Sequence, residues 1–315
     1  MSSLGFNTSG QFTVNGNAVK YGQNYIMNGG FDYWNYATSQ TTDGYGSDDR
    51  WRNSNAGSTK VHSMVNSTDT ERALFNSSKF SRTEVTSVAG ASNFVLKTQA
   101  IENITKLAGK TVTVSFWAKA DSSKNIAIDI QQAFGTGGTP STAISGIGAQ
   151  LIALTNTWQK KTITMQIPSI VGKTLGTDGV HTSSTELFFW FDAGSDFNAR
   201  TASLGQQSGT FDIAEVKLEE GSVATPWTPY EGEFGGEVQA CQRYYQSVKT
   251  MVTTTTATNY ANTFFSPMRV IPSIGTVTFN TGTGSTFVMS SNTLLYPTAN
   301  HSAPAVATIP LSAEL

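Results

Sequence analysis

The feature that most constrains this chain is a period-two alternation of apolar and polar side chains between residues 111 and 193. In "KTVTVSFWAKAD" the alternating apolar positions are Val112, Val114, Phe116 and Ala118. "NIAIDIQQAF" and "KKTITMQI" repeat the pattern, and this period predicts strands with one buried face. The stretch "TELFFWFDAG" is apolar on both faces, so we expect it in the middle of a sheet, covered on both sides.

Turn-forming stretches separate these strands and favour an antiparallel architecture. "GTGGTP", "VGKTLGTDG" and "AGSDFNARTASLGQQSG" are rich in Gly, Ser and Thr, and no helical pattern lies between the strands. Charged residues are only 13% of the chain, against roughly 25% in an average globular protein, which is typical of a turn-rich β protein. We therefore predict that the main body, residues 25–232, is a β-sandwich rather than a parallel α/β sheet.

The segments on either side of the main body have different patterns. Residues 1–24 are polar and dotted with glycine, so we interpret them as an N-terminal arm or attachment segment. After Pro229 a helical pattern replaces the strand pattern, which predicts a short helical connector over residues 233–249. Strand patterning then resumes, and residues 250–315 are expected to form a small C-terminal β domain.

The connector holds the single cysteine of the chain, within "EVQACQRYYQ". Val238, Cys241, Tyr245 and Val248 are spaced three, four and three residues apart, which places them in one narrow stripe on a helix. The stripe is too narrow for a monomer core, and three copies packed around an axis would bury it, so we predict an oligomer interface. A reactive thiol is the alternative, but a lone cysteine at such a position more often acts as a small hydrophobe.

Charge and composition disfavour several classes of function. The 20 basic residues are scattered among 22 acidic ones, so nucleic acid is not an expected partner. The N-terminus lacks the pattern of a secretion signal, and no apolar run approaches the ~18 residues that span a bilayer, so we expect no membrane insertion. Zinc is not expected, because the three histidines lie far apart in the sequence: His62, His181 and His301.

Sequence signals for catalysis are missing as well. There is no GxSxG nucleophile elbow, and the glycine-rich pieces "GTGG" at 135–138 and "GTGS" at 282–285 lack the Lys-Ser/Thr ending of a phosphate loop and a following helix. Acidic residues occur in the main body, but nothing in the sequence fixes a pair at the separation that glycoside hydrolysis needs. We therefore expect that the protein is not an enzyme.

The strand faces opposite the aliphatic ones carry aromatic and planar polar side chains. Sugars are bound by aromatic faces and by planar polar groups that hold hydroxyls, and neither kind of contact needs a titrating residue. If one sheet carries them all, the following residues form a glycan-binding site: Trp117, Lys119, Asp129, Gln131, Trp190, Asp192, Asn198 and Arg200. The alternative is that Trp117 and Trp190 belong to a second buried face, under a loop or a neighbouring subunit.

Calcium is the one cofactor that the sequence suggests. Asn28 and Asp32 in "NGGFDYW" and Asp212 in "TFDIAE" lie near the two ends of the main body. Hard oxygen ligands from the first and last strands can bind a structural calcium ion that ties such ends together. The alternative is that these residues form turns at strand edges and hold no ion.

Long blocks of the sequence resemble a family of bacteriophage and prophage tail-fibre adhesins. The blocks are "NYIMNGGFDYWN", "DDRW", "LAGKTVTVSFWAKAD", "WQKKTITMQIPSIVGKTLGT", "RTASLGQQSGTFDIAEVKLEEGSVATPW" and "CQRYY". In that family a jelly roll like a carbohydrate-binding module precedes a short helical connector and a small β tip domain. The resemblance thus implies an all-β chain with a jelly-roll β-sandwich over residues 25–232, a connector at a trimer axis, and a tip.

The resemblance also implies a function. Such proteins are virion surface components, usually homotrimers, that bind bacterial surface polysaccharide; other phage tail or virion proteins would hold the N-terminal arm. We expect the protein on the phage particle after synthesis in the host cytoplasm, as a compact head or adaptor without a fibrous shaft. One alternative is a structural virion protein, a capsid decoration or a fibre or baseplate adaptor, that uses the sandwich for protein contacts only. A depolymerase is a third hypothesis.

Overall fold

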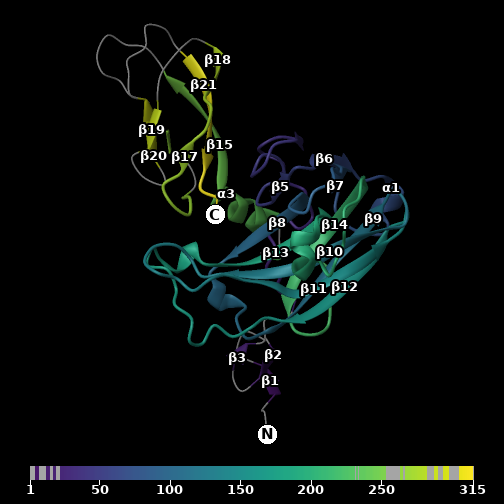
Figure 1. Cartoon of the computed structure of the whole chain (residues 1–315). Helices are drawn as coiled ribbons and strands as arrows, with labels where there is room; N and C mark the ends of the chain where they lie inside the picture. Colours follow the sequence, from purple (N-terminus) through teal and green to yellow (C-terminus); the bar gives the residue numbers. More distant parts are fainter. Residues whose placement is uncertain are drawn as a thin grey trace, which may run out of the picture.

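The computed structural model describes residues 4–6, 12–14, 17–18, 22–230, 232, 234–252, 263–264, 267–281, 287–289, 294–297 and 305–314. Figure 1 shows a β-sandwich at the centre and a C-terminal β unit beside it, with the helix α3 between them. Within the predicted arm, three short strands form a small antiparallel sheet: β1 (Leu4–Phe6), β2 (Phe12–Val14) and β3 (Asn17–Ala18).

Two antiparallel sheets form the sandwich. The five-stranded sheet has the order β11 (Ile144–Leu154), β10 (Lys124–Ala133), β13 (Ser184–Ala193), β8 (Phe94–Glu102) and β5 (Arg52–Ala56). The six-stranded sheet has the order β12 (Gln159–Gln166), β9 (Thr111–Ala120), β14 (Gly209–Glu220), β7 (Lys79–Thr86), β6 (Thr59–Asn66) and β4 (Ser39–Gln40). This confirms the predicted all-β jelly-roll sandwich, with β13 in the middle of its sheet as expected.

Short helical turns connect the strands. They are α1 (Asp69–Arg72), η1 (Ile104–Lys106), η2 (Val180–Thr182), η3 (Ser195–Phe197) and α2 (Asn198–Thr201). Asn24 precedes the first sandwich strand, is fully buried, and donates from Nδ2 to the carbonyl oxygens of Val216 and Thr228. The sandwich therefore includes Asn24, one residue before its predicted boundary.

The alternation in the sequence determines which side chains fill the space between the sheets. From β9 the core takes Val112, Val114 and Phe116, and from β13 it takes Leu187, Phe189 and Phe191. The rings of Phe116 and Phe189 meet edge to face across the sandwich, with centroids 5.1 Å apart. Full burial of a side chain of this size stabilises the fold by about 1.5–3 kcal/mol, so these strands hold the two sheets together.

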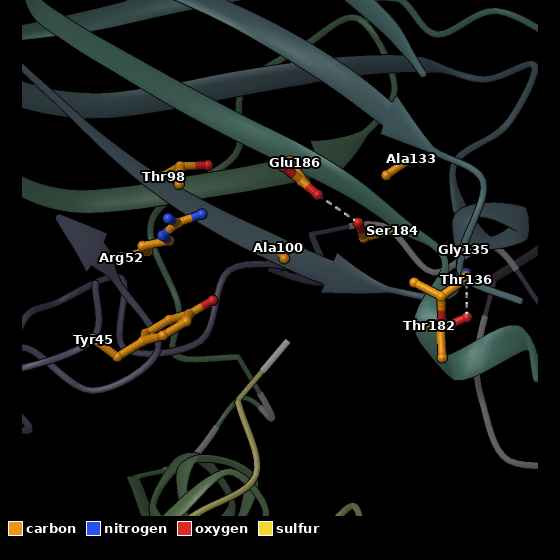
Figure 2. A pocket seen from close by; sticks show the side chains of 10 residues that line it. All are labelled: Tyr45, Arg52, Thr98, Ala100, Ala133, Gly135, Thr136, Thr182, Ser184 and Glu186. Atoms are coloured by element: carbon orange, nitrogen blue, oxygen red, sulfur yellow. Dashed lines mark hydrogen bonds between the residues drawn. The ribbon is translucent and has the colours of Figure 1, made fainter. Parts of the chain in front are cut away.

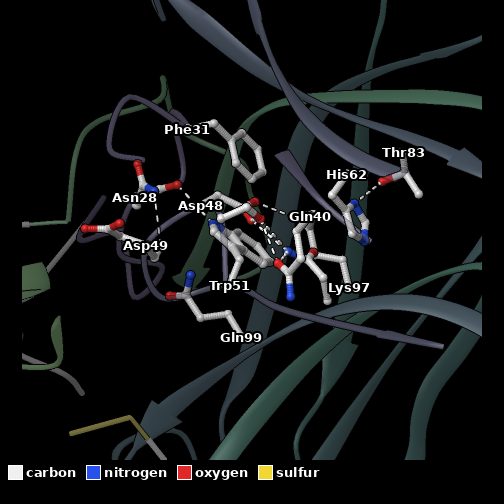
Figure 3. Close-up of polar contacts among 12 residues, drawn as sticks. Asn28, Phe31, Gln40, Asp48, Asp49, Trp51, His62, Thr83, Lys97 and Gln99 are labelled. Carbon is white, nitrogen blue, oxygen red and sulfur yellow. Dashed lines mark hydrogen bonds and ion pairs between the residues drawn. The ribbon is translucent and has the colours of Figure 1, made fainter. Parts of the chain in front are cut away.

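The block "DDRW" supplies a buried ion pair to this core (Figure 3). Asp48 and Lys97 are both fully buried, and the ammonium group of Lys97 contacts the carboxylate of Asp48. The other oxygen of Asp48 accepts hydrogen bonds from Ser47 Oγ and Asn53 Nδ2, each at 2.8 Å. Burial lowers the pKa of Lys97, and the neighbouring carboxylate opposes that shift. The pair thus satisfies charges that the sandwich would otherwise leave unpaired in a dry interior.

The other three residues of the block each have a separate role. Asp49 accepts hydrogen bonds from the backbone and side-chain amides of Asn35, at 2.8 and 2.5 Å. Arg50 forms an ion pair with Glu314 of the C-terminal β unit. Trp51 is fully buried, and its indole donates to the carbonyl oxygen of Asn28 at 3.0 Å. The block therefore joins the first turns of the sandwich both to its core and to the end of the chain.

The predicted connector is shorter than expected. Helix α3 covers Phe234–Gln242, and strand β15 (Tyr245–Val252) begins three residues later. The stripe of apolar residues at helical spacing is therefore interrupted, because Tyr245 and Val248 lie on a strand. The prediction of one continuous helical seam over 233–249 is wrong.

Two of the four predicted interface residues are buried inside the single chain. Cys241 is 2% exposed and packs with Met27, Ala240 and Tyr244. Tyr245 is 6% exposed, and its ring stacks on Tyr36 with centroids 3.5 Å apart. Neither side chain is available to a second copy, so their assignment to an interface is corrected. Burial also raises the pKa of the Cys241 thiol, which favours the unreactive protonated form.

The C-terminal β unit comprises two small sheets. One has the order β15, β21 (Ala305–Ser312) and β17 (Ser273–Ile274), with β18 (Thr278–Thr281) also paired to β21; the other has the order β16 (Thr263–Phe264), β20 (Leu294–Pro297) and β19 (Phe287–Met289). Its core contains Met268, Ala307, Ile309, Leu311 and Ala313. Residues 253–262 of the predicted tip domain lie outside the described residues, as do 265–266, 282–286, 290–293, 298–304 and 315.

Glu237 of α3 predicts a pH dependence of stability. Its Oε1 accepts from the backbone amides of Asn28 and Tyr230, at 2.9 and 3.3 Å, whereas its buried Oε2 has no hydrogen-bond partner. Burial raises the pKa of Glu237 to about 7 from 4.5, and the carboxylate of Asp32 contributes. The folded state therefore binds this proton more tightly than the unfolded state does, and the resulting stabilisation is lost as pH rises from about 4.5 through about 7.

A Glu237→Gln variant should lose part of this dependence, because its amide does not titrate. We expect urea denaturation at pH 5 and pH 8 to show a smaller drop in unfolding free energy for the variant than for the natural chain. Asp49, whose pKa burial raises to about 6, keeps a slope of the same sign in both proteins. Identical drops in the two proteins would contradict the role given to Glu237.

Candidate functional site

The structure separates the predicted glycan-binding residues onto two sheets. Trp117 and Lys119 lie on β9 in the six-stranded sheet, whereas Gln131 on β10 and Trp190 on β13 belong to the five-stranded sheet. Arg200 lies on α2, next to the five-stranded sheet. The four side chains on strands point away from the shared core, as the alternation predicts, but the outer faces of the two sheets lie on opposite sides of the sandwich. The prediction that one sheet carries them all is wrong.

Trp190 is covered and is not a surface for stacking a sugar. Its side chain is 1% exposed, and its indole donates to Asp129 Oδ1 at 2.8 Å. The guanidinium of Arg200 lies over the rings of Phe188 and Trp190, and its Nε donates to Asp129 Oδ2 at 2.8 Å. For Trp190 the alternative of a second buried face is confirmed, because α2 and η3 form a lid over this part of the sheet.

Trp117 and Lys119 belong to a cluster of aromatic and charged side chains that contact one another. Trp117 is half-buried, with its ring centroid 6.2 Å from that of Phe75. The ammonium of Lys119 lies 3.2 Å from Glu71 Oε1 and 4.8 Å from the ring centroid of Trp158. Hydrogen bonds from Trp158, Lys119 and Thr68 lower the pKa of Glu71 to about 2, against the opposing effect of burial. This arrangement fastens α1 to the six-stranded sheet.

The three predicted calcium ligands do not form one metal site. Asp212 accepts both Arg82 Nε and Arg82 Nη2, at 2.8 and 2.9 Å, and Lys119 lies 3.7 Å away, so cationic side chains already neutralise it. Asn28 is buried in the turn that contacts Tyr33 and Asp49. Among the described residues, no group of three or more His, Cys, Asp or Glu side chains is placed to hold a metal ion.

Asp32, the third predicted ligand, lies near a different acid. Its Oδ1 accepts from Ser78 Oγ at 2.8 Å, and its buried Oδ2 has no hydrogen-bond partner. Burial raises the pKa of Glu215, with a contribution from the negative charge of Asp32. The sequence grouped Asp32 with Asp212 because they lie near the two ends of the main body, whereas in the structure the negative charge of Asp32 acts on Glu215.

A pocket lies on the outer face of the five-stranded sheet (Figure 2). Tyr45 and Arg52 lie on one side of the pocket, Thr136 and Thr182 on the other, and Glu186 between them. The complete lining is Tyr45, Arg52, Thr98, Ala100, Ala133, Gly135, Thr136, Thr182, Ser184 and Glu186. Its volume is about 190 Å³, below the ~300 Å³ at which pockets for drug-sized ligands begin. A ligand that enters it would insert one small ring and leave the rest outside.

Glu186 is the central polar group of the pocket. Ser184 Oγ donates to its Oε1 at 2.7 Å, and Gln131 Nε2 lies 3.5 Å from its Oε2. Gln131 is thus the one predicted glycan-binding residue whose hydrogen bond reaches this pocket. Burial raises the pKa of Glu186, whereas Arg200 and Arg52 oppose the shift and Asp129 adds to it. The two oxygens of Glu186 are oriented by Ser184 and Gln131 and can accept further hydrogen bonds from hydroxyl donors.

An aromatic ring and a cation complete the pocket wall. Gly44, with φ of +103°, pairs with Asn53 through two backbone hydrogen bonds of 3.0 Å, and this bridge positions the loop that carries Tyr45. Arg52 begins β5, and its guanidinium lies 3.3 Å from Asp43 Oδ2, with both side chains about half exposed. The pocket therefore combines an aromatic ring with a carboxylate, a guanidinium and hydroxyl groups.

Sequence reasoning missed most of these residues. Glu186 shares the outward phase of Phe188 and Trp190 on β13, so the alternation was a signal that could have found it. Tyr45 lies on a loop and Arg52 on a short strand, and their partners across the pocket are more than 80 residues away in the sequence. Local patterning carries no information about such contacts.

Comparisons with known proteins give a low level of similarity. No family model matches the chain, and no curated protein matches it. Among solved structures, a CBM4 structure covers 62% of this chain and 99% of its own, with 18% identity and a TM-score of 0.34. The family 11 carbohydrate-binding module from Clostridium thermocellum, solved with a β-1,3-1,4-mixed-linked tetrasaccharide, covers 57% and 94%, with 13% identity and a TM-score of 0.33.

A phage protein is also among the similar structures. The enzymatically active domain of tailspike protein 4 from bacteriophage CBA120 matches 62% of this chain and 21% of its own, with 14% identity and a TM-score of 0.34. Similarity at this level does not transfer a ligand or a reaction from those proteins to this chain. In the described part of the chain, no helix is long and apolar enough to cross a membrane.

Proposed function

We propose that this chain is a glycan-binding protein without catalytic activity, of the receptor-binding, tail-fibre type on a bacteriophage particle. The observation that carries the binding proposal is the pocket on the five-stranded sheet, where the Tyr45 ring stands beside planar polar groups from Arg52 and Glu186. Such a combination offers a stacking face and oriented acceptors and donors for sugar hydroxyls. The sequence blocks that resemble tail-fibre adhesins support the location on a virion.

The charges of the pocket favour an uncharged sugar. Glu186 occupies the middle of the pocket, where the carboxylate of an acidic sugar would meet a like charge. The one cation in the lining, Arg52, is already paired with Asp43. Hydroxyl groups of a neutral hexose, by contrast, donate to Glu186 and accept from Arg52. Host-surface polysaccharides with neutral residues at accessible positions are therefore the proposed ligands.

The neighbouring carboxylate supports a role without catalysis. Asp129 influences Glu186, but its own oxygens accept from Trp190, Arg200 and the backbone amide of Gly146, at 2.8, 2.8 and 3.0 Å. Asp129 is fully buried with both oxygens held by these donors, and it is not among the residues that line the pocket, so it does not contact a ligand there. Among the described residues that line the pocket, Glu186 has no second acid of the kind that glycoside hydrolysis requires.

Binding of the purified full-length chain to arrays of bacterial surface glycans tests the proposal. We expect binding to neutral glycans, and Glu186→Gln should weaken it at least about tenfold, because a charge-assisted acceptor is lost. The matched control is Glu84→Gln on the exposed part of β7, which should leave binding unchanged. Equal binding by both variants would contradict the proposed site.

The position of the protein on the particle separates the two virion hypotheses. Labelling at a tail tip, together with reduced adsorption of particles that lack the protein, supports receptor binding. If no glycan binds while the chain is folded, and particles without it assemble poorly but adsorb normally, the protein is structural instead. We propose a homotrimer, with Val238 and Val248 as the half-buried residues that remain from the predicted interface, since several weak sites on one head add avidity.

A further inference from the structure

The C-terminal β unit touches the frame of the glycan pocket at three places. Each contact joins the segment 243–314 to a residue close to the pocket. That residue either precedes a lining residue in the sequence or is paired with one. Glu314 and its partner Arg50 form the first contact, Arg269 the second, and Tyr244 with Arg243 the third. In Figure 2 the end of the chain passes below Tyr45 and Ala100.

The first contact is a buried ion pair. Arg50 Nη1 pairs with Glu314 Oε2, and the two side chains are 1% and 6% exposed. Arg50 Nη2 then donates to the carbonyl oxygen of Ala100 at 2.8 Å, and Ala100 lines the pocket. The ring of Tyr244 covers the guanidinium, 3.5 Å from its centre. Through Arg50, Glu314 of the C-terminal unit is thus linked to β8, the strand that forms the pocket floor.

The other two contacts are made near the wall of the pocket that carries Thr182 and Ser184. Arg269 donates from Nη1 to the carbonyl oxygen of His181 at 3.3 Å, and His181 precedes Thr182 of the pocket wall. Arg269 is fixed in turn by hydrogen bonds to the carbonyl oxygens of Ala313 and Glu314, at 3.1 and 3.4 Å. Tyr244 donates to Glu102 at 2.9 Å, and Glu102 is the β8 residue opposite Ser184 of β13.

We propose that the C-terminal β unit sets the shape of the glycan pocket, with Glu314 and Arg269 as positioning residues. This rests on the proposed function of the pocket. The unit contacts, through Arg50, Ala100 in the floor of the pocket and the segment 181–184 in one wall, so its docking sets the position of that wall relative to the floor. A binding site held by supporting contacts loses affinity when those contacts are removed, although no group that touches the ligand has changed.

The coupling is reciprocal by thermodynamic necessity: if docking of the unit favours ligand binding, the ligand favours docking to the same extent. A contact that only stabilises the fold would not couple docking of the unit to glycan binding. Exchange of backbone amides, followed by mass spectrometry on the full-length chain, measures both directions, because each segment reports its own opening.

The test compares Glu314→Gln, which removes the charge at nearly constant shape, with Glu220→Gln, which removes one partner of the exposed pair with Lys110. We expect Glu314→Gln to speed exchange in segments 98–102 and 181–186 at least about fivefold, and to weaken glycan binding by a similar factor. Glu220→Gln should change neither. In the natural chain, saturating glycan should slow exchange in residues 305–314.

Unchanged exchange in 98–102 and 181–186, while 305–314 exchanges faster, would overturn the positioning role. If Glu314→Gln disturbs the whole chain, seen as faster exchange in residues 112–118 of the core, Arg269→Lys provides the second variant, since it keeps the charge and loses the fork of donors. If the natural chain binds no glycan, the proposed function fails by itself, and the exchange data still decide whether the unit fixes the walls.

Discussion

Replacing Asp48 by Asn is expected to lower the free energy of unfolding by about 3–5 kcal/mol. The change leaves the ammonium of Lys97 fully buried without its counter-charge, because the Asp48 carboxylate is the partner that contacts it. The aromatic rings of Phe31 and Trp51, 5.5 and 5.6 Å from the ammonium, do not compensate for a lost carboxylate. Urea denaturation at neutral pH measures the difference.

Two comparisons identify the cause of this loss. Asp48→Asn combined with Lys97→Met removes both charges and should recover most of the stability, because no unpaired charge then remains in the core. Glu220→Gln in the exposed pair with Lys110 should cost no more than about 1 kcal/mol. An Asp48→Asn variant as stable as the natural chain would show that water or another group reaches Lys97.

The second large effect concerns the ligand rather than the fold. Tyr45→Ala should weaken binding of the preferred glycan at least about tenfold, which corresponds to about 1.4 kcal/mol. The ring forms one wall of the pocket, and a sugar ring in the pocket would bury its face against it. Tyr45→Phe keeps this face and should cost less than Tyr45→Ala.

Calorimetric titration with the tightest array glycan measures both variants. Because Tyr45 is half-buried and lies on a loop, the unfolding free energy of Tyr45→Ala should change much less than its affinity does. An unchanged affinity, or a loss of affinity that matches a general loss of stability, would contradict a direct contact between Tyr45 and the sugar.

The sandwich was predictable because its strands carry the period of two in their own residues. The strands expected around residues 112–118, 126–130, 161–167 and 187–191 are all present, and their inward phases form the core. The central position of β13 was also predictable, since only a strand covered on both faces tolerates Phe188 and Trp190 next to Phe189.

The candidate site was not predictable in the same way. Alternation says which side chains point outward, but not which sheet a strand joins. β9 and β10 are consecutive in the sequence and belong to opposite sheets, so Trp117 on β9 and Gln131 on β10 both point outward and lie on different sides of the molecule. Sheet membership depends on pairing between distant segments, and a period within one strand does not encode it.

The connector shows long-range pairing prevailing over a local pattern. The helical spacing runs from Val238 to Val248, but residues 245–252 pair with β21, and Ala313 N donates to the carbonyl oxygen of Tyr244 at 2.6 Å. Strand pairing with residues 305–312 thus ends the helix at Gln242. The cysteine that suggested an interface lies on α3 and instead packs against Met27.

A crystal structure of the full-length chain with the neutral oligosaccharide that binds best on the array tests the central claim most directly. We predict a sugar ring beside Tyr45, with hydroxyl groups within hydrogen-bond distance of Glu186 and Arg52. A sugar bound instead against Trp117 and Trp158 on the six-stranded sheet, with the pocket on the five-stranded sheet empty, would contradict it.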